Sequence, residues 1–529
     1  MIFTLKELFL EYVSDKIWAD EAFIAKVLSY LEQNPLISEE EVFAKLKERE
    51  KVYLENLELK KTFLGNCNDK PWINESFIDK GLYYFEQNPL VSKKELVDKL
   101  NESEKELKKS YMKVIRNLSN NLPNFDMTIF YPVHCESIIK IKTKNNFFKI
   151  KGRYKVLIAP YCDFPYKAFH EYRDEFIEVC GKDDVIEIPY TFQSEQPYLI
   201  SLNWLVDNEE ITLLKKMVYA LESDLFGMKY LKGDLHVHTT YSDGCEHPEL
   251  VISLARKYGL DFVAITDHKN YQGSVIGEVA AKRLGNKITV LRGEECDFSF
   301  SPMHILSLGA PQGLNPDYLG DKILELESTK NIITNYAGLA CDITAYACTQ
   351  AFLDQIRENG GVSIICHPLW KYFLHDGKRK DAPYSLLLAL FKDKRFDGIE
   401  LISGSGKNDS DTNNLQDLLF REIGIKYDCM PVIGVTDSHC YETSEIAGLH
   451  YTIVFSKNRE AESIIEAIRN NRTVAVSQKE KNGVAQCYGS LRYAQFAHFL
   501  IKHYFPKQDE RAFVEGMEML DNLYSFKEL

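Results

Sequence analysis

The sequence lacks the features that would place it in a membrane or in an export pathway. No uninterrupted apolar run reaches the length of about 18 residues that a membrane-spanning helix needs. The first residues, Met1–Leu8, have no basic region, no clean apolar core and no cleavage site of a signal peptide. The 12 cysteines include no Cys-x-x-Cys, so we expect mostly buried, unpaired thiols rather than a disulfide framework. These absences predict a cytoplasmic protein without a membrane partner.

Positive charge is also scarce. The chain has 64 Lys and Arg against 78 Asp and Glu, a net charge of −14. Such a surface disfavours broad, non-specific binding of nucleic acid, although a local basic channel stays compatible with it. The length of 529 residues and the hydrophobic content of 45% are typical of a globular chain with about two to four domains.

Residues 1–120 contain an internal repeat. The segment 15–36 recurs at 69–90, and Glu-Gln-Asn-Pro-Leu is identical in both copies. The proline stops one helix, and Ser38 followed by Glu41 is a capping-box pattern that begins the next. We therefore predict two related helical hairpins, which serve either for packing or as a docking surface for a protein partner or a homo-oligomer.

The middle and the end of the chain have other sequence patterns. Residues 121–208 alternate apolar and polar positions between prolines and glycines, which predicts a small β-rich domain. Residues 209–231 are predicted to form a connecting helix. Residues 481–529 are predicted to form C-terminal helices whose aromatic side chains make a core or a dimer contact.

Residues 232–480 alternate strands and helices. Helices are predicted between most of the strands, and this alternation predicts a parallel α/β sheet with crossover connections. Seven strands indicate a closed or nearly closed barrel, whose site lies where the carboxyl ends of the strands meet. The predicted strands cover residues 234–237, 262–266, 288–292, 304–308, 362–366, 398–402 and 431–435.

Imidazoles and carboxylates gather at the ends of these strands. His236 and His238 lie two residues apart, and so on one face of the first strand, and Asp243 follows in the next turn. The other candidates are His268, one of Glu294 and Glu295, His304, His367, Asp437 and His439. These are the donor types that bind Zn, Mn and Fe. Nine donors are too many for one ion, so the pattern predicts a cluster of two or three divalent ions (Mn, Fe or Zn).

The order of these motifs resembles a known family. His-x-His, Ser-Asp-Gly, Thr-Asp-His, Gly-x-Glu, His, His-Pro and Asp-x-His follow one another as in the PHP (polymerase and histidinol phosphatase) superfamily, over residues 232–477. The resemblance implies a distorted (β/α)7 barrel with a trinuclear metal site, and it selects Glu295 over Glu294 as the ligand. No polymerase domain accompanies it, so the resemblance is to the stand-alone phosphoesterases. Asp267, in Thr-Asp-His, is expected to support catalysis by orienting His268 or a neighbour.

The loop 369–381 follows His367 and is expected at the mouth of the site. Lys371 or Arg379 would hold a phosphate, Trp370 would stack on a base, and His375 would act as a general acid. The alternative is a solvated loop without a role in binding.

The predicted function is metal-dependent hydrolysis of a phosphoester by a metal-activated hydroxide. The substrate would be a small phosphomonoester or phosphodiester, nucleotides included. One alternative is a metal-dependent nuclease that acts on DNA or RNA with a partner protein docked on the N-terminal helices. The other is a non-catalytic binding module stabilised by metal.

Overall fold

The computed structural model divides the chain into two compact units. The second unit comprises Phe130–His134, Phe192–Pro197 and Tyr219–Leu529, and the first comprises the rest of the chain up to Val218. The residues that the structure describes are 8–10, 21–33, 37–47, 125–143, 153–161, 177–180, 185–206, 209–297, 303–315, 320–321, 323–325, 341–369, 371–373, 379–381, 384–404, 410–422, 430–480 and 483–525.

The first unit begins with helices of the first repeat copy. These are α2 (Glu21–Gln33) and a helix over residues 39–47. The backbone N–H of Glu41 donates to Oγ of Ser38 at 3.2 Å, which is one half of the predicted capping box. Phe9, Leu31 and Leu46 are buried together in a small core. The second copy, residues 69–90, lies outside the described residues.

The β-rich part of the first unit contains two antiparallel arrangements. One sheet has the order β1-β3-β6, and the other contains β8, β7, β4 and β5 in that order, with β2 at the end of β8 in the second unit. The strands are β1 (Phe125–Asp126), β2 (Phe130–Pro132), β3 (Ser137–Thr143), β4 (Arg153–Pro160), β5 (Ile177–Cys180), β6 (Val185–Tyr190), β7 (Gln196–Val206) and β8 (Glu209–Leu221).

The predicted connecting helix is wrong, because Glu209–Leu221 is strand β8. Its many Glu, Lys and Leu residues favour a helix as an isolated segment. However, Leu213, Leu214 and Val218 are buried in the sheet, and this burial outweighs intrinsic propensity.

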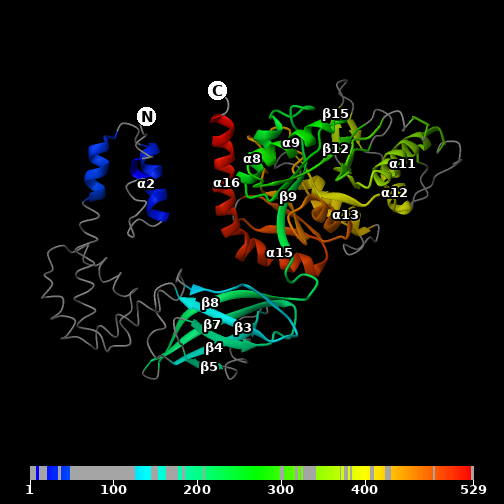
Figure 1. The fold of residues 1–529 in the computed structure, drawn as a ribbon. Helices are drawn as coiled ribbons and strands as arrows, with labels where there is room; N and C mark the ends of the chain where they lie inside the picture. Colours follow the sequence, from blue (N-terminus) through cyan, green and yellow to red (C-terminus); the bar gives the residue numbers. More distant parts are fainter. Residues whose placement is uncertain are drawn as a thin grey trace, which may run out of the picture. The chain divides into compact units, whose positions relative to one another are not determined.

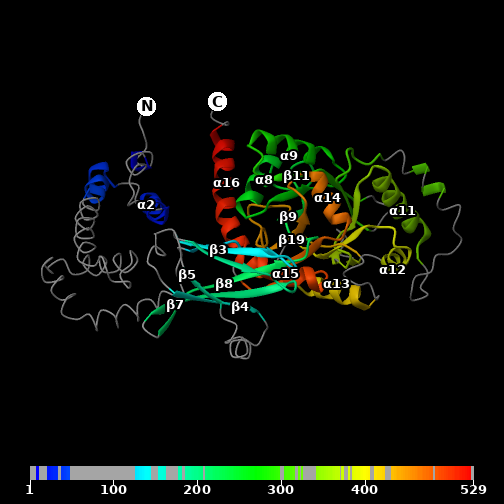
Figure 2. The same cartoon turned by 60° about the horizontal axis from the view of Figure 1, so that its bottom comes forward.

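The second unit is built on two sheets (Figures 1 and 2). Their orders are β11-β10-β9-β19-β20-β21 and β12-β13-β14-β17-β18. The strands are β9 (Lys229–Val237), β10 (Phe262–Ile265), β11 (Thr289–Leu291), β12 (Gly293–Cys296), β13 (Ile305–Leu308), β14 (Val362–Ile365), β17 (Gly398–Ile402), β18 (Val432–Gly434), β19 (His450–Ser456), β20 (Thr473–Gln478) and β21 (Ala485–Tyr488). Strands β15 (Lys371–Phe373) and β16 (Arg379–Asp381) pair with each other and form a separate two-stranded sheet.

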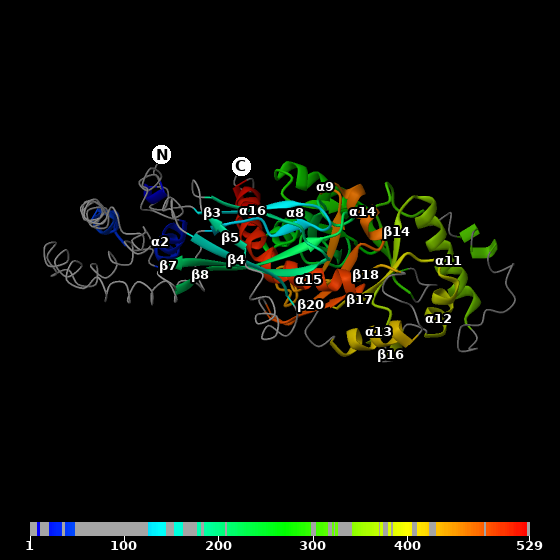
Figure 3. The same ribbon diagram turned by 90° about the horizontal axis from the view of Figure 1, so that it is seen from below.

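Helices cover the outside of these sheets. They are α8 (Pro248–Lys257), α9 (Gln272–Arg283), α11 (Ile343–Glu358), α12 (Tyr384–Asp393), α13 (Ser410–Glu422), α14 (Ala461–Arg469), α15 (Leu491–His503) and α16 (Phe505–Ser525). Helix α14 lies against the strands of the second unit (Figure 3). It packs Ile464 and Ile468 into a core that includes Leu291 and Leu306, from one strand of each sheet. No helix among the described residues has the length and apolar character required to cross a bilayer.

Strand β13 departs from the expected parallel order. The pairs β9–β10, β14–β17 and β17–β18 are parallel, whereas β13 runs antiparallel to both β12 and β14. The connection from β12 to β13, residues 297–304, is too short for a crossover helix. Because β13 is reversed, His304 precedes its strand and still lies at the edge where β12 and β14 end.

Two isolated bridges connect the sheets at this same edge. They pair Val237 with Ser438 and His268 with Glu295. The pairing among the described residues is therefore that of two sheets joined by isolated bridges, and it does not confirm the closed or nearly closed barrel that was predicted. The fold class is mixed α/β.

The C-terminal helices complete the core of the second unit. Phe496 of α15 contacts the rings of Phe130, Tyr230 and Phe455. Arg256 of α8 donates to Glu515 of α16 through Nε and Nη2, at 2.9 and 2.7 Å. The aromatic residues that were expected in a core or a dimer contact thus form part of a core.

Candidate metal centre

The end of β9 meets the end of β18 in a buried cluster. Nε2 of His236 lies 3.0 Å from Oε2 of Glu295 and 3.3 Å from Oδ1 of Asp437. Nε2 of His238 lies 3.1 Å from the same Asp437 oxygen. Both histidines and Glu295 are fully buried. We call His236, His238, Glu295 and Asp437 the inner set.

Glu295 contacts five imidazoles that come from the ends of four strands. Its Oε2 also lies 3.2 Å from Nδ1 of His268, while its Oε1 lies 2.8 Å from Nδ1 of His304 and 3.3 Å from Nε2 of His367. Glu294, one residue earlier, points elsewhere, and its Oε1 accepts from the backbone N–H of Leu314 at 2.6 Å. The structure therefore brings Glu295, not Glu294, to the cluster.

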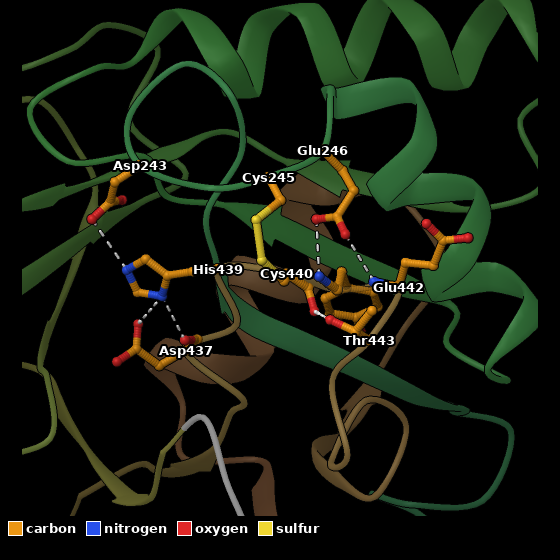
Figure 4. Close-up of a disulfide and its surroundings, with 9 residues drawn as sticks. Asp243, Cys245, Glu246, Asp437, His439, Cys440, Glu442 and Thr443 are labelled. Carbon is orange, nitrogen blue, oxygen red and sulfur yellow. Dashed lines mark hydrogen bonds and ion pairs between the residues drawn. A yellow bond between two sulfur atoms is a disulfide. The ribbon is translucent and has the colours of Figure 1, made fainter.

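A second group of donors adjoins the inner set, and Figure 4 shows two of its members, Asp243 and His439, next to Asp437. Oδ2 of Asp243 lies 3.3 Å from Nε2 of His439 and 3.8 Å from Nε2 of His268, and its Oδ1 lies 3.6 Å from Nδ1 of His238. The side chains of Asp243 and His439 are 55% and 37% exposed, so this end of the cluster is open. We call His238, Asp243, His268 and His439 the outer set.

The donor chemistry fits divalent metal ions. The inner and outer sets each place one ligand atom per residue within 4.8 Å of the others, and so do three further groups. Nδ1 of His268 is buried and makes no hydrogen bond to any described residue, as expected of a nitrogen that binds a cation. Imidazole with carboxylate suits Zn, Mn and Fe alike. The nine predicted donors lie together at one edge of the two sheets.

The charges of the cluster are strongly coupled. Burial lowers the pKa of His238, but hydrogen bonds to Asp437 and Glu295 outweigh it and raise that pKa to about 9. The pKa of His236 is likewise raised, since Glu295, Asp437 and Glu400 overcome burial. For Glu295, burial favours a higher pKa, yet the surrounding imidazoles hold it well below its usual value. Such shifts are typical of functional sites.

Two buried carboxylates that hold the donors were missed from the sequence. Oε1 of Glu400 lies 2.6 Å from Nδ1 of His236, and its Oε2 accepts from the backbone N–H of His367 at 2.7 Å. Asp234 accepts from the N–H of His236 and from Oγ1 of Thr436, at 3.3 and 2.6 Å. Glu400 could have been found from the sequence, because it is a lone acid inside the apolar strand Gly-Ile-Glu-Leu-Ile, and a buried acid needs a partner.

Asp267, which was expected to orient His268 or a neighbour, contacts residues next to His238 instead of His268. Its carboxylate accepts from the N–H and Oγ1 of Thr239 and from Oγ of Ser242, each at 2.7 Å, rather than orienting His268. It therefore fixes the loop after β9, and Ser242 in turn lies 3.5 Å from Nδ1 of His238. Being fully buried, Asp267 holds the site instead of facing a substrate.

The predicted substrate residues are not placed by the structure. Trp370 and His375 lie outside the described residues. Lys371 and Arg379 begin strands β15 and β16, which pair with each other, but their side chains are not described.

The prediction of unpaired cysteines fails at one position. Cys245 and Cys440 form a disulfide whose Cα atoms are 5.0 Å apart (Figure 4). The partners are 195 residues apart in sequence, so nothing in their spacing indicated the pair. Among the residues that the structure describes, Cys135, Cys296, Cys341, Cys366 and Cys487 form no disulfide.

Unusual backbone conformations occur at the same strand ends. Lys269, His367 and Asp437 have positive φ values of 50°, 21° and 51°. Side chains other than glycine rarely occupy this region, and such residues cluster at functional sites. At His367 and Asp437, this conformation belongs to the donor itself.

Comparison with known proteins agrees with this geometry. Residues 234–403 match the family model of the PHP domain. An uncharacterised protein of Methanocaldococcus jannaschii is 32% identical over 108 residues, which are 18% of this chain and 62% of that protein. A phosphoribosyl 1,2-cyclic phosphate 1,2-diphosphodiesterase of Eggerthella lenta is 37% identical over 84 residues, 15% of this chain and 31% of that protein. The chain thus spans less than two thirds of both relatives.

A solved structure also resembles the chain. It is a two-domain protein from Bacteroides vulgatus that contains a predicted PHP-like metal-dependent phosphoesterase, with 20% identity and a TM-score of 0.34, covering 48% of this chain and 66% of that one. By the family match, residues 234–403 of this chain are similar to a PHP domain.

Proposed function

We propose that this chain is a metal-dependent phosphoesterase that hydrolyses a small phosphomonoester or phosphodiester. The observation that carries the proposal is the buried carboxylate of Glu295, which lies within 3.3 Å of five imidazoles. A carboxylate among so many nitrogen donors would be a ligand of divalent cations, whose charge would offset its own. The proposed ligands of two or three Mn, Fe or Zn ions are His236, His238, Asp243, His268, Glu295, His304, His367, Asp437 and His439.

Neighbouring groups prepare the donors for this role. Nδ1 of His439 donates to the backbone oxygen of Asp437 at 3.0 Å, which leaves Nε2 free to bind a cation next to Asp243. Glu400 acts in the same way on Nδ1 of His236. A hydrogen-bonded imidazole of this kind has a fixed orientation and tautomer.

Bound divalent ions would supply two effects, an acidified water and neutralisation of charge on the phosphoryl group. The buried and the exposed donors have different roles. The inner set excludes solvent on the side of the strands, whereas Asp243, His439 and His304, which is 23% exposed, face the side from which a phosphoester arrives.

The substrate class is drawn from the site and from one relative. The relative from Eggerthella lenta is named for hydrolysis of a cyclic phosphodiester, which supports including diesters as well as monoesters. Nucleic acid is a less favoured substrate, because the chain carries a net charge of −14.

A substrate panel tests the proposal. The metal-depleted protein is reloaded with Mn, Fe or Zn and assayed on nucleotides, sugar phosphates, bis-p-nitrophenyl phosphate and labelled oligonucleotides. We expect turnover of small esters with at least one metal. Cleavage of oligonucleotides alone would point to a nuclease, and inactivity on every ester with every metal would contradict the proposal.

Two adjacent substitutions sharpen this test. Glu295→Gln should reduce kcat/KM by more than about 100-fold, because it removes a charge shared by several donors. Glu294→Gln is the matched control, since an amide oxygen can still accept from Leu314, and it should keep nearly full activity. Equal activities of the two variants would remove Glu295 from the centre.

A further inference from the structure

The two most exposed donors lie on loops that are joined covalently. Asp243 lies two residues before Cys245, and His439 lies one residue before Cys440 (Figure 4). Cys245 is exposed and Cys440 is partly exposed, so the disulfide is accessible to small reductants and oxidants. The other donors of the outer set, His238 and His268, follow strands β9 and β10.

Non-covalent contacts also join the loops. The N–H of Cys245 donates to the backbone oxygen of His439 at 2.6 Å. The carboxylate of Glu246 accepts from the N–H groups of Tyr441 and Glu442 at 2.9 and 3.0 Å. The loops should therefore stay folded when the disulfide is reduced, while losing the covalent limit on the separation of Asp243 and His439.

We propose that Cys245 and Cys440 form a redox-controlled tether that sets the metal affinity of the outer set. This inference rests on the proposed function, because it takes the outer set as a metal site. The cysteines are positioning residues, since they act through Asp243 and His439. In the oxidised form, the tether limits the separation of Asp243 and His439, whose facing atoms lie 3.3 Å apart and would hold one ion. In the reduced form, Asp243 and His439 move more independently. Binding of an ion must then restrict this motion, and the entropy cost weakens binding.

The redox step is a two-electron exchange. On oxidation, the two thiols lose two protons and two electrons and form the S–S bond. Hydrogen peroxide, as the oxidant, takes up these electrons and protons and yields two molecules of water. A small disulfide such as glutathione disulfide instead accepts them by exchange and leaves as two thiols.

The effect should be largest at the outer set, because Asp243 and His439 lie on the tethered loops and belong to that set alone. His236 and Glu295 of the inner set lie on strands β9 and β12 and are fully buried, and the shared His238 directly follows β9. Reduction should then weaken the outer ion most, whereas general unfolding would release every ion.

Metal binding of the full-length protein tests the tether. Mn²⁺ binding is measured by the electron paramagnetic resonance of free Mn²⁺, for oxidised protein and for protein reduced with tris(2-carboxyethyl)phosphine and desalted under argon. We expect the weakest Mn²⁺ to lose about tenfold or more in affinity on reduction, the loss typical when a residue that orients metal ligands is removed. Re-oxidation with glutathione disulfide should restore it.

Variants separate the tether from other thiols. Cys245→Ser and Cys440→Ser should each reproduce the reduced state and no longer respond to reductant, whereas Cys135→Ser, at an exposed free cysteine, should behave as the wild type. Circular dichroism confirms that each variant is folded, and the reductant titration of the wild type does not depend on any variant. Identical Mn²⁺ affinities in oxidised and reduced wild type would overturn the proposal.

The two proposals fail in different ways. If the oxidised protein binds Mn²⁺ in a reductant-sensitive manner but hydrolyses no phosphoester, the proposed function falls and the tether stands. If phosphoesters are hydrolysed and reduction leaves Mn²⁺ binding unchanged, only the tether falls.

Discussion

Glu294 and Glu295 are identical in type and adjacent in sequence, yet their carboxylates reach opposite sides of β12. Successive residues of a strand point to opposite faces, so only one of the pair can reach the cluster. Glu295 lies against the imidazoles and Glu294 against the N–H of Leu314. At this scale, the alternation of a strand decides which acid is available to a metal.

Glu400 should matter for metal binding although it is not among the proposed ligands. Its Oε1 accepts from Nδ1 of His236 and its Oε2 from the N–H of His367. Glu400→Gln should therefore weaken Mn²⁺ binding by about 10–100-fold. Titration calorimetry measures this, with Glu462→Gln on the surface of α14 as the control. Wild-type affinity in Glu400→Gln would show that the carboxylate does not orient His236.

Metal binding should release protons near neutral pH. In the metal-free protein, burial lowers the pKa of His238, but Asp437 and Glu295 raise it to about 9, so the ring is protonated at neutral pH. A bound cation needs the neutral ring, so the proton must leave. Apparent affinity should rise with pH until about pH 9 is passed. Calorimetry in buffers of different ionisation enthalpy counts the protons, and a count of zero would contradict the assignment.

The sequence allowed the donors to be predicted better than the groups behind them. His236, His238 and the other donors stand in short motifs of recognisable order. Glu400 has only apolar neighbours in sequence, and its partners His236 and His367 lie at the ends of other strands. Asp234 lies next to the first motif, but its partner Thr436 comes from a distant segment. The Cys245–Cys440 pair was hidden for the same reason, since its contact exists only after the domain has folded.

At the scale of elements, strand direction was harder to predict than strand position. The predicted strands 304–308 and 398–402 correspond to β13 and β17 within one residue. The reversal of β13 was missed because periodicity does not report direction. Strand β8 was mistaken for a helix because its composition favours a helix, whereas its strand conformation depends on burial between β2 and β7, which the local sequence does not report.

The loop after β9 should be intolerant of a side chain at Gly244. A Cβ there would lie 2.5 Å from backbone atoms of His238 and Thr239, which cannot move without shifting a donor. Gly244→Ala should therefore displace Asp243 and weaken Mn²⁺ binding by about tenfold. Gly320→Ala, where a Cβ has open space, is the control for equilibrium dialysis. Unchanged binding in Gly244→Ala would mean that the loop can adjust without moving its donor.

At the scale of the second unit, the C-terminal helix is held by a buried ion pair. Arg256 and Glu515 link α8 to α16, and their side chains are 4% and 11% exposed. Gly516 follows Glu515 at a point where a Cβ would lie 2.3 Å from the backbone of Lys257. The close approach of the helices makes the pair hard to solvate.

Removing Arg256 should destabilise the protein markedly. Arg256→Met leaves Glu515 buried without its main partner, at a cost of about 3–5 kcal/mol in the free energy of unfolding. Arg511→Met is a matched control, because Arg511 pairs with the same carboxylate from an exposed position and should cost about 1 kcal/mol or less. Urea unfolding measures the loss of unfolding free energy in both variants. Equal losses would show that burial does not determine how much the Arg256–Glu515 pair stabilises the protein.

The difference in exposure between the two ends of the metal centre should affect how fast each ion dissociates. Ions at the inner set would be enclosed by buried side chains, while an ion at the outer set would border solvent through Asp243 and His439. Dissociation from the two ends should then proceed at separate rates. A chelator would draw off the outer ion in a fast phase and the inner ions only as fast as the ends of the strands open.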